Sequence, residues 1–452
     1  MMASERALLV FGFLFVVISG LLAAPLPAFA ADKEKVLYRF AAYGYQDGSN
    51  PVGGVIFDAA GNLYGTTNLG GAACNSGGTV FELMPSADGK WTEKILHSFP
   101  CNTEDGSGPT GSLIFDAKGN LYSTTLGGGS YNSGTVFEME PGTNGHWTER
   151  VLHSFGNGDD GAKPWSGVIL DAAGNLYGTT NLGGAHKTNC SGDSCGTVFQ
   201  LRPGRNGQWT EKVLHSFDNN GEDGFWPGAG LAIDAAGDLY GTAEGGHEGC
   251  RTNAGCGTVF ELSPSASGKW TEKIINYFSG RNGANPDSNL IFDAAGNLYG
   301  TTVWGGRPEC DDDYHVGCGT VFELMPDAYG NWTEKTVRHF YKAKAPGGGV
   351  IFDAAGNLYG TTTLGGRYWD GNGDCLESCG GIAFELSPGA NGKWTKTTLH
   401  SFGSHHSILD DGNEPMGSLV FDAAGNLYGT TFLGGNQCAA GAGCGAVFEI
   451  TP

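Results

Sequence analysis

One sequence element recurs seven times along the chain and constrains its fold more than any other feature. The element is DAAGNLYGTT, with small changes between copies. Its leading aspartate marks the same position in every unit: Asp58, Asp116, Asp171, Asp234, Asp293, Asp353 and Asp422. Successive units are 55 to 69 residues apart. A repeat of this length is typical of an array of small supersecondary units that are stable only when packed on one another.

Each unit contains four short runs that are rich in β-branched and aromatic residues. In the first unit these runs cover 54–58, 63–67, 79–84 and 91–99, and Gly, Pro, Asn and Asp separate them. Runs bounded in this way are typical of strands, and no helical periodicity occurs after residue 31. Seven units of four strands predict an all-β chain that folds as a seven-bladed β-propeller with four-stranded blades.

The two ends of the repeat array predict how the ring closes. The seventh unit stops after its third run, 446–451, so its fourth strand is missing. The segment ADKEKVLYRF near the N-terminus aligns with WTEKILHSF of the first unit. We therefore expect 36–40 to supply the outer strand of the last blade, which leaves no unpaired sheet edge. Residues 31–452 would then form a single propeller domain.

An apolar run precedes the repeats. Residues 7–24 follow Arg6 and come before Ala28-Phe29-Ala30, which has the A-x-A pattern of a signal-peptidase site. Residues 1–30 are therefore predicted to be a signal peptide, with an uncleaved membrane anchor as the alternative. Cleavage would give a secreted or periplasmic protein with no membrane insertion, and we expect this mature chain to be a monomer.

Twelve cysteines in a chain with an export signal indicate disulfides. Ten of them form close pairs, each between a GG element and the next GTVF-like run: Cys190/Cys195, Cys250/Cys256, Cys310/Cys318, Cys375/Cys379 and Cys438/Cys444. Cys74 has the same place in the first unit, and Cys101 remains as its expected partner. Metal binding by paired thiolates is the alternative, and the absence of C-x-x-C spacing disfavours it.

The formal net charge of -22 restricts the partners of the chain. It argues against nucleic acid and anionic lipid, because both are polyanions. Cations and neutral or basic ligands remain compatible with this charge, and solubility alone also explains it.

The elements DAAGNLYGTT-x-x-GG, GTVFELMP and WTEKILHSF together resemble the GloVer-type tandem-repeat proteins, which are exported bacterial proteins of the choice-of-anchor group. The resemblance covers residues 34–452. It implies an extracytoplasmic repeat protein and does not imply an activity. The D-x-x-G-N-L-Y core is also similar to the strand–turn–strand of NHL and SMP-30-like propellers, a likeness that bears on the fold alone.

The tryptophans fall into two groups. Six of the ten open an outer run and belong to the repeat: Trp91, Trp147, Trp209, Trp270, Trp332 and Trp394. The others interrupt the repeat and map to the face that carries the D-G-x-x-P and cysteine-bearing segments. Aromatic side chains gathered on one face suit stacking on sugar rings or a protein partner, and packing within the Gly-rich loops is the alternative. The ligand-binding candidates are Trp165, Trp226, Trp304, Tyr368 and Trp369.

A calcium loop is the candidate for a cofactor site, although we expect no obligatory cofactor. Asp370, Asn372 and Asp374 have the alternating spacing of calcium ligands. No Glu stands at the twelfth position, and Cys375 follows directly, so a disulfide-stapled loop is the alternative.

Two other polar patterns recur in most units: D-G-x-x-P in five of them and a histidine in four of the outer runs. The aspartates of D-G-x-x-P are explained by turn formation, with a ring of carboxylates that gathers cations as the alternative. The histidines of the outer runs are expected to be structural, because they are too far apart to converge on one ion: His97, His153, His215 and His400.

No catalytic residue is predicted. The chain contains no nucleophile elbow, H-E-x-x-H motif, phosphate loop or nucleotide fingerprint. The innermost runs are also nearly identical, whereas a catalytic centre needs unlike residues at equivalent positions. We expect a non-catalytic exported propeller that binds a glycan or an extracellular or envelope protein through its disulfide-stapled loop face. The alternatives are a propeller enzyme, such as a metal-dependent lactonase, another hydrolase or a polysaccharide lyase, and a purely structural envelope protein.

Overall fold

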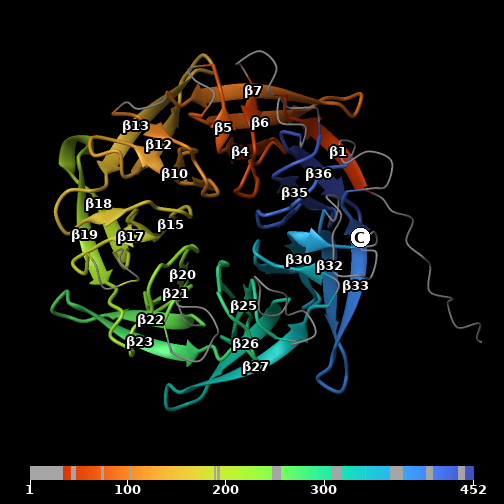
Figure 1. Ribbon diagram of the computed structural model, residues 1–452. Helices are drawn as coiled ribbons and strands as arrows, with labels where there is room; N and C mark the ends of the chain where they lie inside the picture. Colours follow the sequence, from red (N-terminus) through yellow and green to blue (C-terminus); the bar gives the residue numbers. More distant parts are fainter. Residues whose placement is uncertain are drawn as a thin grey trace, which may run out of the picture. The chain divides into compact units, whose positions relative to one another are not determined.

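The strands of each unit pair antiparallel in chain order, and seven such four-stranded sheets stand around one axis as blades (Figure 1). The computed structural model describes residues 34–41, 47–72, 76–100, 104–187, 190, 194–246, 256–306, 318–341, 343–366, 380–403, 411–435 and 443–452. All of them belong to the unit Asp32–Pro452. The predicted signal peptide, 1–30, lies outside the described residues.

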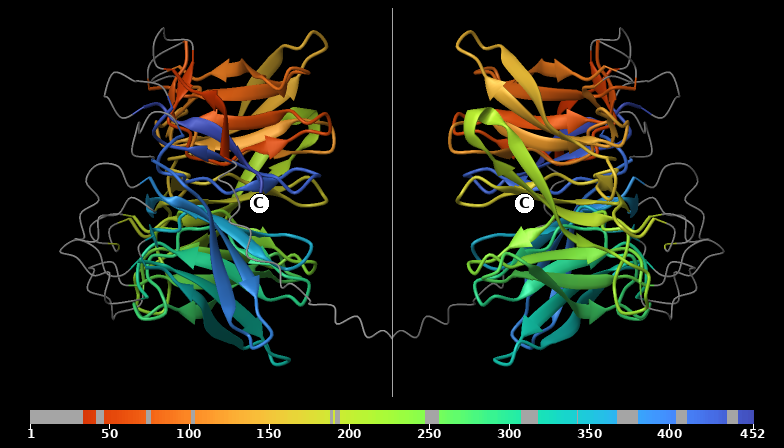
Figure 2. Two further views of the ribbon diagram at one scale, coloured as in Figure 1. Left: turned by 90° about the vertical axis from the view of Figure 1, so that its right-hand side faces the viewer. Right: turned by 90° about the vertical axis from the view of Figure 1, so that its left-hand side faces the viewer.

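The prediction of an all-β, seven-bladed propeller is confirmed. In the described ranges the one helical element is a short 3-10 turn, η1 (Arg205–Gly207), and no helix there is long and apolar enough to span a membrane. The two side views show the sheets standing side by side around the ring (Figure 2).

The strands occupy four concentric positions. The innermost strands are β3 (Ile56–Phe57), β9 (Ile114–Phe115), β15 (Ile169–Leu170), β20 (Ala232–Ile233), β24 (Ile291–Phe292), β29 (Val350–Phe352) and β34 (Val420–Phe421). The second strands are β4 (Leu63–Thr67), β10 (Leu121–Thr125), β16 (Leu176–Thr180), β21 (Leu239–Ala243), β25 (Leu298–Thr302), β30 (Leu358–Thr362) and β35 (Leu427–Thr431).

The outer half of each blade has longer strands. The third strands are β6 (Thr79–Pro85), β12 (Thr135–Pro141), β18 (Thr197–Pro203), β22 (Thr258–Pro264), β26 (Thr320–Pro326), β32 (Ile382–Pro388) and β36 (Ala446–Ile450). The outermost strands are β7 (Trp91–Ser98), β13 (Trp147–Ser154), β19 (Trp209–Ser216), β23 (Trp270–Tyr277), β27 (Trp332–His339), β33 (Trp394–Ser401) and β1 (Glu34–Arg39).

The innermost strands are shorter than predicted, because the chains crowd together near the axis. The predicted run 54–58 keeps only Ile56–Phe57 in the ladder. The residue Gly54 instead faces the neighbouring blade, where an added Cβ would lie 2.4 Å from the carbonyl oxygen of Ser418. Only glycine allows two backbones to approach so closely.

The N-terminal strand closes the ring, as predicted. Strand β1 pairs antiparallel with β36, with Glu34 opposite Ile450 and Arg39 opposite Ala446. It begins two residues earlier than the predicted 36–40 and ends before Phe40. The blade that contains the C-terminus therefore takes its outer strand from the other end of the chain (Figure 1).

The core lies at the seams between blades. A phenylalanine that follows each outermost strand packs edge-to-face or tilted on a phenylalanine in the third strand of the next blade, with centroids 4.9 to 5.2 Å apart. The pairs are Phe40–Phe81, Phe99–Phe137, Phe155–Phe199, Phe217–Phe260, Phe278–Phe322, Phe340–Phe384 and Phe402–Phe448. Each buried cluster thus combines two blades, so a blade cannot bury its own core alone.

The repeated D-A-A-G-N segment is a turn whose carboxylate is used locally. Asp58 Oδ1 accepts the N–H groups of Ala60 and Asn62, both at 2.8 Å. Its Oδ2 accepts the side-chain amide of Asn62 at 2.9 Å and the hydroxyl of Tyr64 at 3.2 Å. Gly61 supplies the positive φ of 87° that the turn requires. The same bonds recur in the last unit around Asp422.

Candidate functional site: the central cavity

The D-G-x-x-P segments carry the chain from the outer strand of one blade to the centre of the next. In three blades the residues after the aspartate form a short ladder with the G-G connection: β2 (Gly48–Ser49) with β5 (Leu69–Gly70), β8 (Gly106–Ser107) with β11 (Gly127–Gly128), and β14 (Gly161–Ala162) with β17 (Leu182–Gly183). The sixth blade lacks the aspartate and forms the same ladder between β28 (Ala343–Lys344) and β31 (Leu364–Gly365). The two kinds of segment therefore share one face, as the sequence predicts.

The residue before each proline fixes the direction of the segment. It has φ between 52° and 64° in every blade: Asn50, Gly108, Lys163, Trp226, Asn285, Ala345 and Glu414. Its N–H donates to a carbonyl of the preceding blade, as from Asn50 to Cys444 at 2.7 Å. Its own carbonyl accepts an N–H from the second-to-third connection, as from Asn68 at 3.1 Å. These two bonds hold the segment in place on both sides.

The residue after each proline lines a central cavity of about 550 Å³. These seven residues are Val52, Thr110, Trp165, Gly228, Asp287, Gly347 and Met416. They differ in size, polarity and charge although their segments have the same backbone. The two residues that follow also line the cavity in most blades and are small: Gly53, Gly111, Ser112, Ser166, Gly167, Ala229, Gly230, Ser288, Asn289, Gly348, Gly417 and Ser418. The cavity thus has a repetitive wall in which the residue after each proline is a variable position.

Aromatic and apolar side chains form part of this wall. Trp165 is 45 % exposed, and its backbone carbonyl accepts the hydroxyl of Thr110 at 2.6 Å. Trp304 also lines the cavity and packs against a buried cluster of the fourth and fifth blades. The indole of Trp165 is therefore the more accessible of the two to a bound molecule.

Asp287, which lines the cavity, lies close to a second carboxylate, that of Glu244, which is not among the lining residues. Glu244 directly follows β21, and Asp287 follows Pro286 in the next blade. An added Cβ on Gly228 would lie 2.5 Å from Asp287 Oδ1 and 2.8 Å from Glu244 Oε1. The two oxygens can be no farther apart than the sum of these distances, and the glycine leaves room for both.

Burial raises the pKa of both carboxyls, and the negative charge of Asp287 raises the pKa of Glu244 further. We expect the pair to hold one proton near neutral pH, on Glu244, because ionising both carboxyls costs like-charge repulsion in a poorly solvated site. The pair therefore offers one hydrogen-bond donor and three acceptor oxygens near neutral pH.

Neither acid was predicted from the sequence. The innermost runs are nearly identical, whereas the variable position lies a few residues earlier, directly after the proline. Aligning the seven units at that position would have singled out Asp287. Glu244 stands where the other units have uncharged residues: Asn68, Leu126, Asn181, Val303, Thr363 and Phe432.

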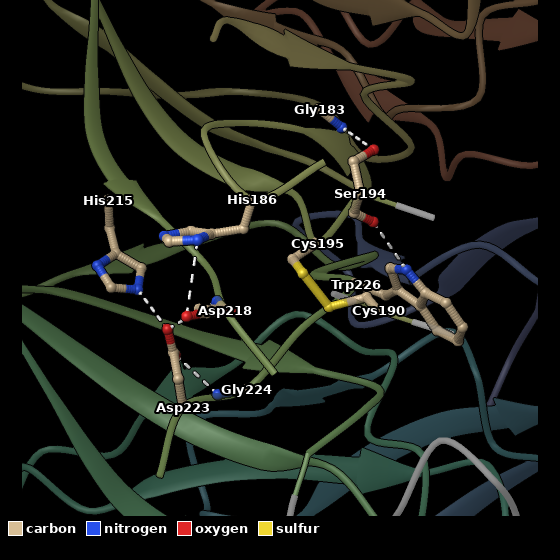
Figure 3. The surroundings of a disulfide bond; sticks show 10 residues. All are labelled: Gly183, His186, Cys190, Ser194, Cys195, His215, Asp218, Asp223, Gly224 and Trp226. Carbon is tan, nitrogen blue, oxygen red and sulfur yellow. Dashed lines mark hydrogen bonds and ion pairs between the residues drawn. A yellow bond between two sulfur atoms is a disulfide. The ribbon is translucent and has the colours of Figure 1, made fainter. Parts of the chain in front are cut away.

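Trp226 does not line the cavity. Its indole Nε1 donates to the carbonyl of Ser194 at 3.1 Å, and its ring packs edge-on against Phe225 with centroids 5.0 Å apart. It also contacts the buried cluster that contains Cys190 and Cys195, as Figure 3 shows. These contacts agree with the alternative interpretation of the tryptophans, in which the indole packs within the Gly-rich loops.

The predicted disulfide between Cys190 and Cys195 is confirmed. Cys256, Cys318 and Cys444 are also disulfide-bonded. The remaining predicted positions lie outside the described residues: Cys74, Cys101, Cys250, Cys310, Cys375, Cys379 and Cys438. The same holds for the ligand candidates Tyr368 and Trp369 and for the calcium candidates Asp370, Asn372 and Asp374.

The aspartates of D-G-x-x-P pair with the histidines of the outer strands, a relation that the sequence did not reveal. The distances between His Nε2 and Asp Oδ2 are 3.2 Å for His97 and Asp105 and 2.9 Å for His153 and Asp160. His215 and Asp223 are 3.0 Å apart. These aspartates therefore belong to the seams between blades, and Asp105, Asp160 and Asp223 are absent from the lining of the central cavity.

One protein family matches the chain. The model described as the Gloeobacter/Verrucomicrobia repeat matches residues 28–189, 88–306 and 249–452, which overlap and together reach from 28 to the last residue. This match confirms the resemblance seen in the repeat elements. No curated protein matches the chain.

The similar solved structures share the fold at low sequence identity. A fungal alcohol oxidase of the AA5 family in complex with copper has a TM-score of 0.55 at 16% identity, over 93% of this chain and 76% of that one. An ancestral GH74 enzyme has a TM-score of 0.52 at 12% identity, and the match spans 93% of this chain and only 51% of the enzyme. At such identities the likeness shows a common propeller architecture and no common activity.

Proposed function

The chain belongs to the Gloeobacter/Verrucomicrobia repeat family, and we propose that it is an exported, non-catalytic propeller that binds a carbohydrate in its central cavity. The observation that carries this proposal is a cavity whose wall contains both the half-exposed Trp165 and the carboxylate of Asp287, with Glu244 close to Asp287. Sugar recognition combines these two elements: a flat apolar surface for the ring and convergent polar groups for its hydroxyls.

The volume and the charge of the cavity restrict the class of ligand that it can bind. Its volume of about 550 Å³ lies within the range of roughly 300–1,000 Å³ that is typical of small-molecule sites. Carboxylate oxygens accept hydrogen bonds from sugar hydroxyls and from ammonium groups, and they repel uronates and sulfates. The ligand class is therefore a neutral or amino-bearing saccharide. The net charge of -22 also disfavours anionic saccharides.

We propose a secreted or periplasmic location, which the chemistry of the loops supports. Structural disulfides persist in oxidising compartments, and the Cys190–Cys195 bond fits a secreted or periplasmic chain. The predicted signal peptide supports the same location. Such a protein would meet glycans of the envelope or of the surroundings.

A binding assay on the mature chain, residues 31–452, tests the proposal. Neutral and amino-bearing oligosaccharides are screened on an array, and the hits are titrated by calorimetry. We expect Trp165→Ala to weaken binding about tenfold or more, because the loss of a stacking contact and its buried area amounts to roughly 1.4 kcal/mol or more. The matched control is Tyr329→Ala, since Tyr329 is 90% exposed and does not line the cavity. Unchanged affinity in Trp165→Ala, or no saccharide bound at all, would contradict the proposal.

The carboxylate pair favours a second candidate, an acid–base hydrolase that acts on such a saccharide. Carboxyls with raised pKa values in a cavity are frequent in catalytic sites, where one gives and the other takes a proton. The discriminating measurement is product formation from the bound saccharide over hours. Turnover that is abolished by Asp287→Asn and by Glu244→Gln would show that the protein is a hydrolase. Binding without turnover would support the non-catalytic, saccharide-binding function.

A further inference from the structure

A second constellation lies away from the cavity, at the seam where the first and second blades meet. His97 belongs to β7, Glu149 belongs to β13 of the next blade, and Asp105 stands at the start of the segment that joins them. One ligand atom from each of the three residues lies within 4.8 Å of the other two. The group thus brings an imidazole nitrogen and two carboxylates together from two blades.

The ligand atoms are held in place by their surroundings. Asp105 Oδ1 accepts the N–H of Gly106 at 2.8 Å, which leaves Oδ2 directed at His97 Nε2 at 3.2 Å. The imidazole packs edge-on against Phe99 with centroids 4.6 Å apart. The two groups therefore need little rearrangement to bind an ion between Nε2 and Oδ2.

Glu149 supplies an independent indication of a missing partner. Its Oε1 atom is buried and has no hydrogen-bond partner among the described residues. A buried polar atom left in this state costs about 1–3 kcal/mol. A cation between the two blades would satisfy it, whereas no side chain of the described ranges does so.

The other seams serve as an internal comparison. Two of them repeat the same three residue types, and their glutamates likewise have a buried, unpartnered Oε1: His153, Asp160 and Glu211, and His215, Asp223 and Glu272. Where the histidine is replaced, a protein donor reaches the other carboxylate oxygen, Oε2, although Oε1 of Glu93 is also buried without a partner. Tyr38 donates to Glu93 Oε2 at 2.9 Å, and Asn282 donates to Glu334 Oε2 at 3.2 Å. Histidine thus accompanies the seams in which no side-chain donor reaches the glutamate.

We propose that this seam binds a divalent transition-metal ion of the zinc class through His97 Nε2 and one oxygen each of Asp105 and Glu149. Imidazole and carboxylate are ordinary ligands of Zn²⁺, which takes tetrahedral coordination with water at an open position. The ion would replace the hydrogen between Nε2 and Oδ2, so the imidazole proton moves to Nδ1. Because the ligands come from two blades, the ion would crosslink the outer strands of the ring.

The test uses the mature, disulfide-bonded chain after treatment with a chelator. Zn²⁺ is titrated by calorimetry, Co²⁺ is titrated by its visible ligand-field absorption, and melting is followed with and without Zn²⁺. We expect binding at micromolar concentration, a nitrogen–oxygen Co²⁺ spectrum and a higher melting temperature with Zn²⁺. His97→Gln and Glu149→Gln should each remove one bound ion.

Glu334→Gln is the matched control, because Glu334 has the same position in a seam without histidine. It should leave the number of bound ions unchanged. Circular dichroism establishes whether each variant is folded. If one of His97→Gln and Glu149→Gln does not fold, the other is sufficient for the test. The proposal is overturned if the stripped chain binds no Zn²⁺, or if a folded His97→Gln or Glu149→Gln variant binds as many ions as the wild type.

Discussion

Glu93 is a side chain through which the stability of one seam between blades depends on pH. The hydroxyl of Tyr38 donates to Glu93 Oε2 at 2.9 Å and lies 3.2 Å from Asp47 Oδ2. Asp47 also accepts the N–H groups of Ala41 and Gly48. Burial raises the pKa of Glu93 to about 8, and the negative charge of Asp47 contributes to the rise. Glu93 therefore keeps its proton at neutral pH, and burial raises the pKa of the neighbouring Asp47 as well.

We predict that this seam weakens as the pH rises. The pKa of glutamate in an unfolded chain is about 4.3, so the folded state binds the proton more tightly. The stabilisation is complete below that value and is lost as the pH rises through about 8. Between pH 6 and 9 the free energy of unfolding should fall, and Glu93→Gln should remove on the order of 2 kcal/mol of that fall. Denaturant unfolding at pH 6, 7, 8 and 9 measures both quantities.

The control for this prediction is Glu104→Gln, because Glu104 is exposed. It should leave the dependence of stability on pH as it is in the wild type. An equally steep fall in Glu93→Gln and the wild type would show that Glu93 does not carry a raised pKa.

The role of a single residue could be predicted from the sequence where the residue interrupts the repeat. It could not be predicted where the residue belongs to the repeat. Trp165 interrupts a repeated segment, so the sequence alone marked it, and it does line the cavity. Glu93 belongs to the repeated W-T-E, and its partners Tyr38 and Asp47 come from another blade and a linker. Only the closed ring brings them together. Asp287 was missed for a different reason, since its position had not been compared between units.

At the level of the elements, the long strands were predicted closely and the short ones were not. The run 63–67 coincides with β4, and 79–84 and 91–99 each differ from β6 and β7 by one residue. Their alternation of β-branched and aromatic residues is a local property of the chain. The ladders between D-G and G-G segments consist of residues with low strand propensity. They form because the two segments meet in space, which no local pattern records.

The disulfide loop of the third blade gives a prediction at this level. Cys190 and Cys195 are fully buried, are separated by five positions and touch the cluster that holds Trp226. Closing so short a loop removes about 2 kcal/mol of entropy from the unfolded chain. The double variant Cys190→Ala, Cys195→Ala should therefore lose roughly 2–4 kcal/mol, since buried contacts are lost as well.

Thermal melting and tryptophan emission of that variant provide the measurements. The emission should change, because the Trp226 indole would lose the fixed carbonyl of Ser194. A thiol titration of the wild type establishes beforehand that these two cysteines are oxidised. Unaltered melting of the double variant would mean that the bond does not support this blade.

The whole molecule is held together by seams that are equivalent around the ring. Each seam carries one of the seven phenylalanine pairs, and each buried cluster takes side chains from two blades. The seam between the last and the first blade is built the same way as the internal ones, although its strand β1 comes from the N-terminal end. In a linear repeat array the terminal unit has only one neighbour and unfolds separately. In this ring no unit is terminal.

A comparison of two equivalent substitutions distinguishes the ring from a linear array. Phe40→Ala opens a cavity at the closing seam, and Phe155→Ala opens the corresponding cavity at the seam of the second and third blades. Both side chains are fully buried, so each loss should cost about 3–5 kcal/mol. Because the ring has no end, both variants should shift one cooperative transition by similar amounts, with near- and far-ultraviolet circular dichroism coincident. If the N-terminal strand were instead a loosely attached end, Phe40→Ala would produce a separate early transition or almost no change, while Phe155→Ala would still destabilise the whole chain.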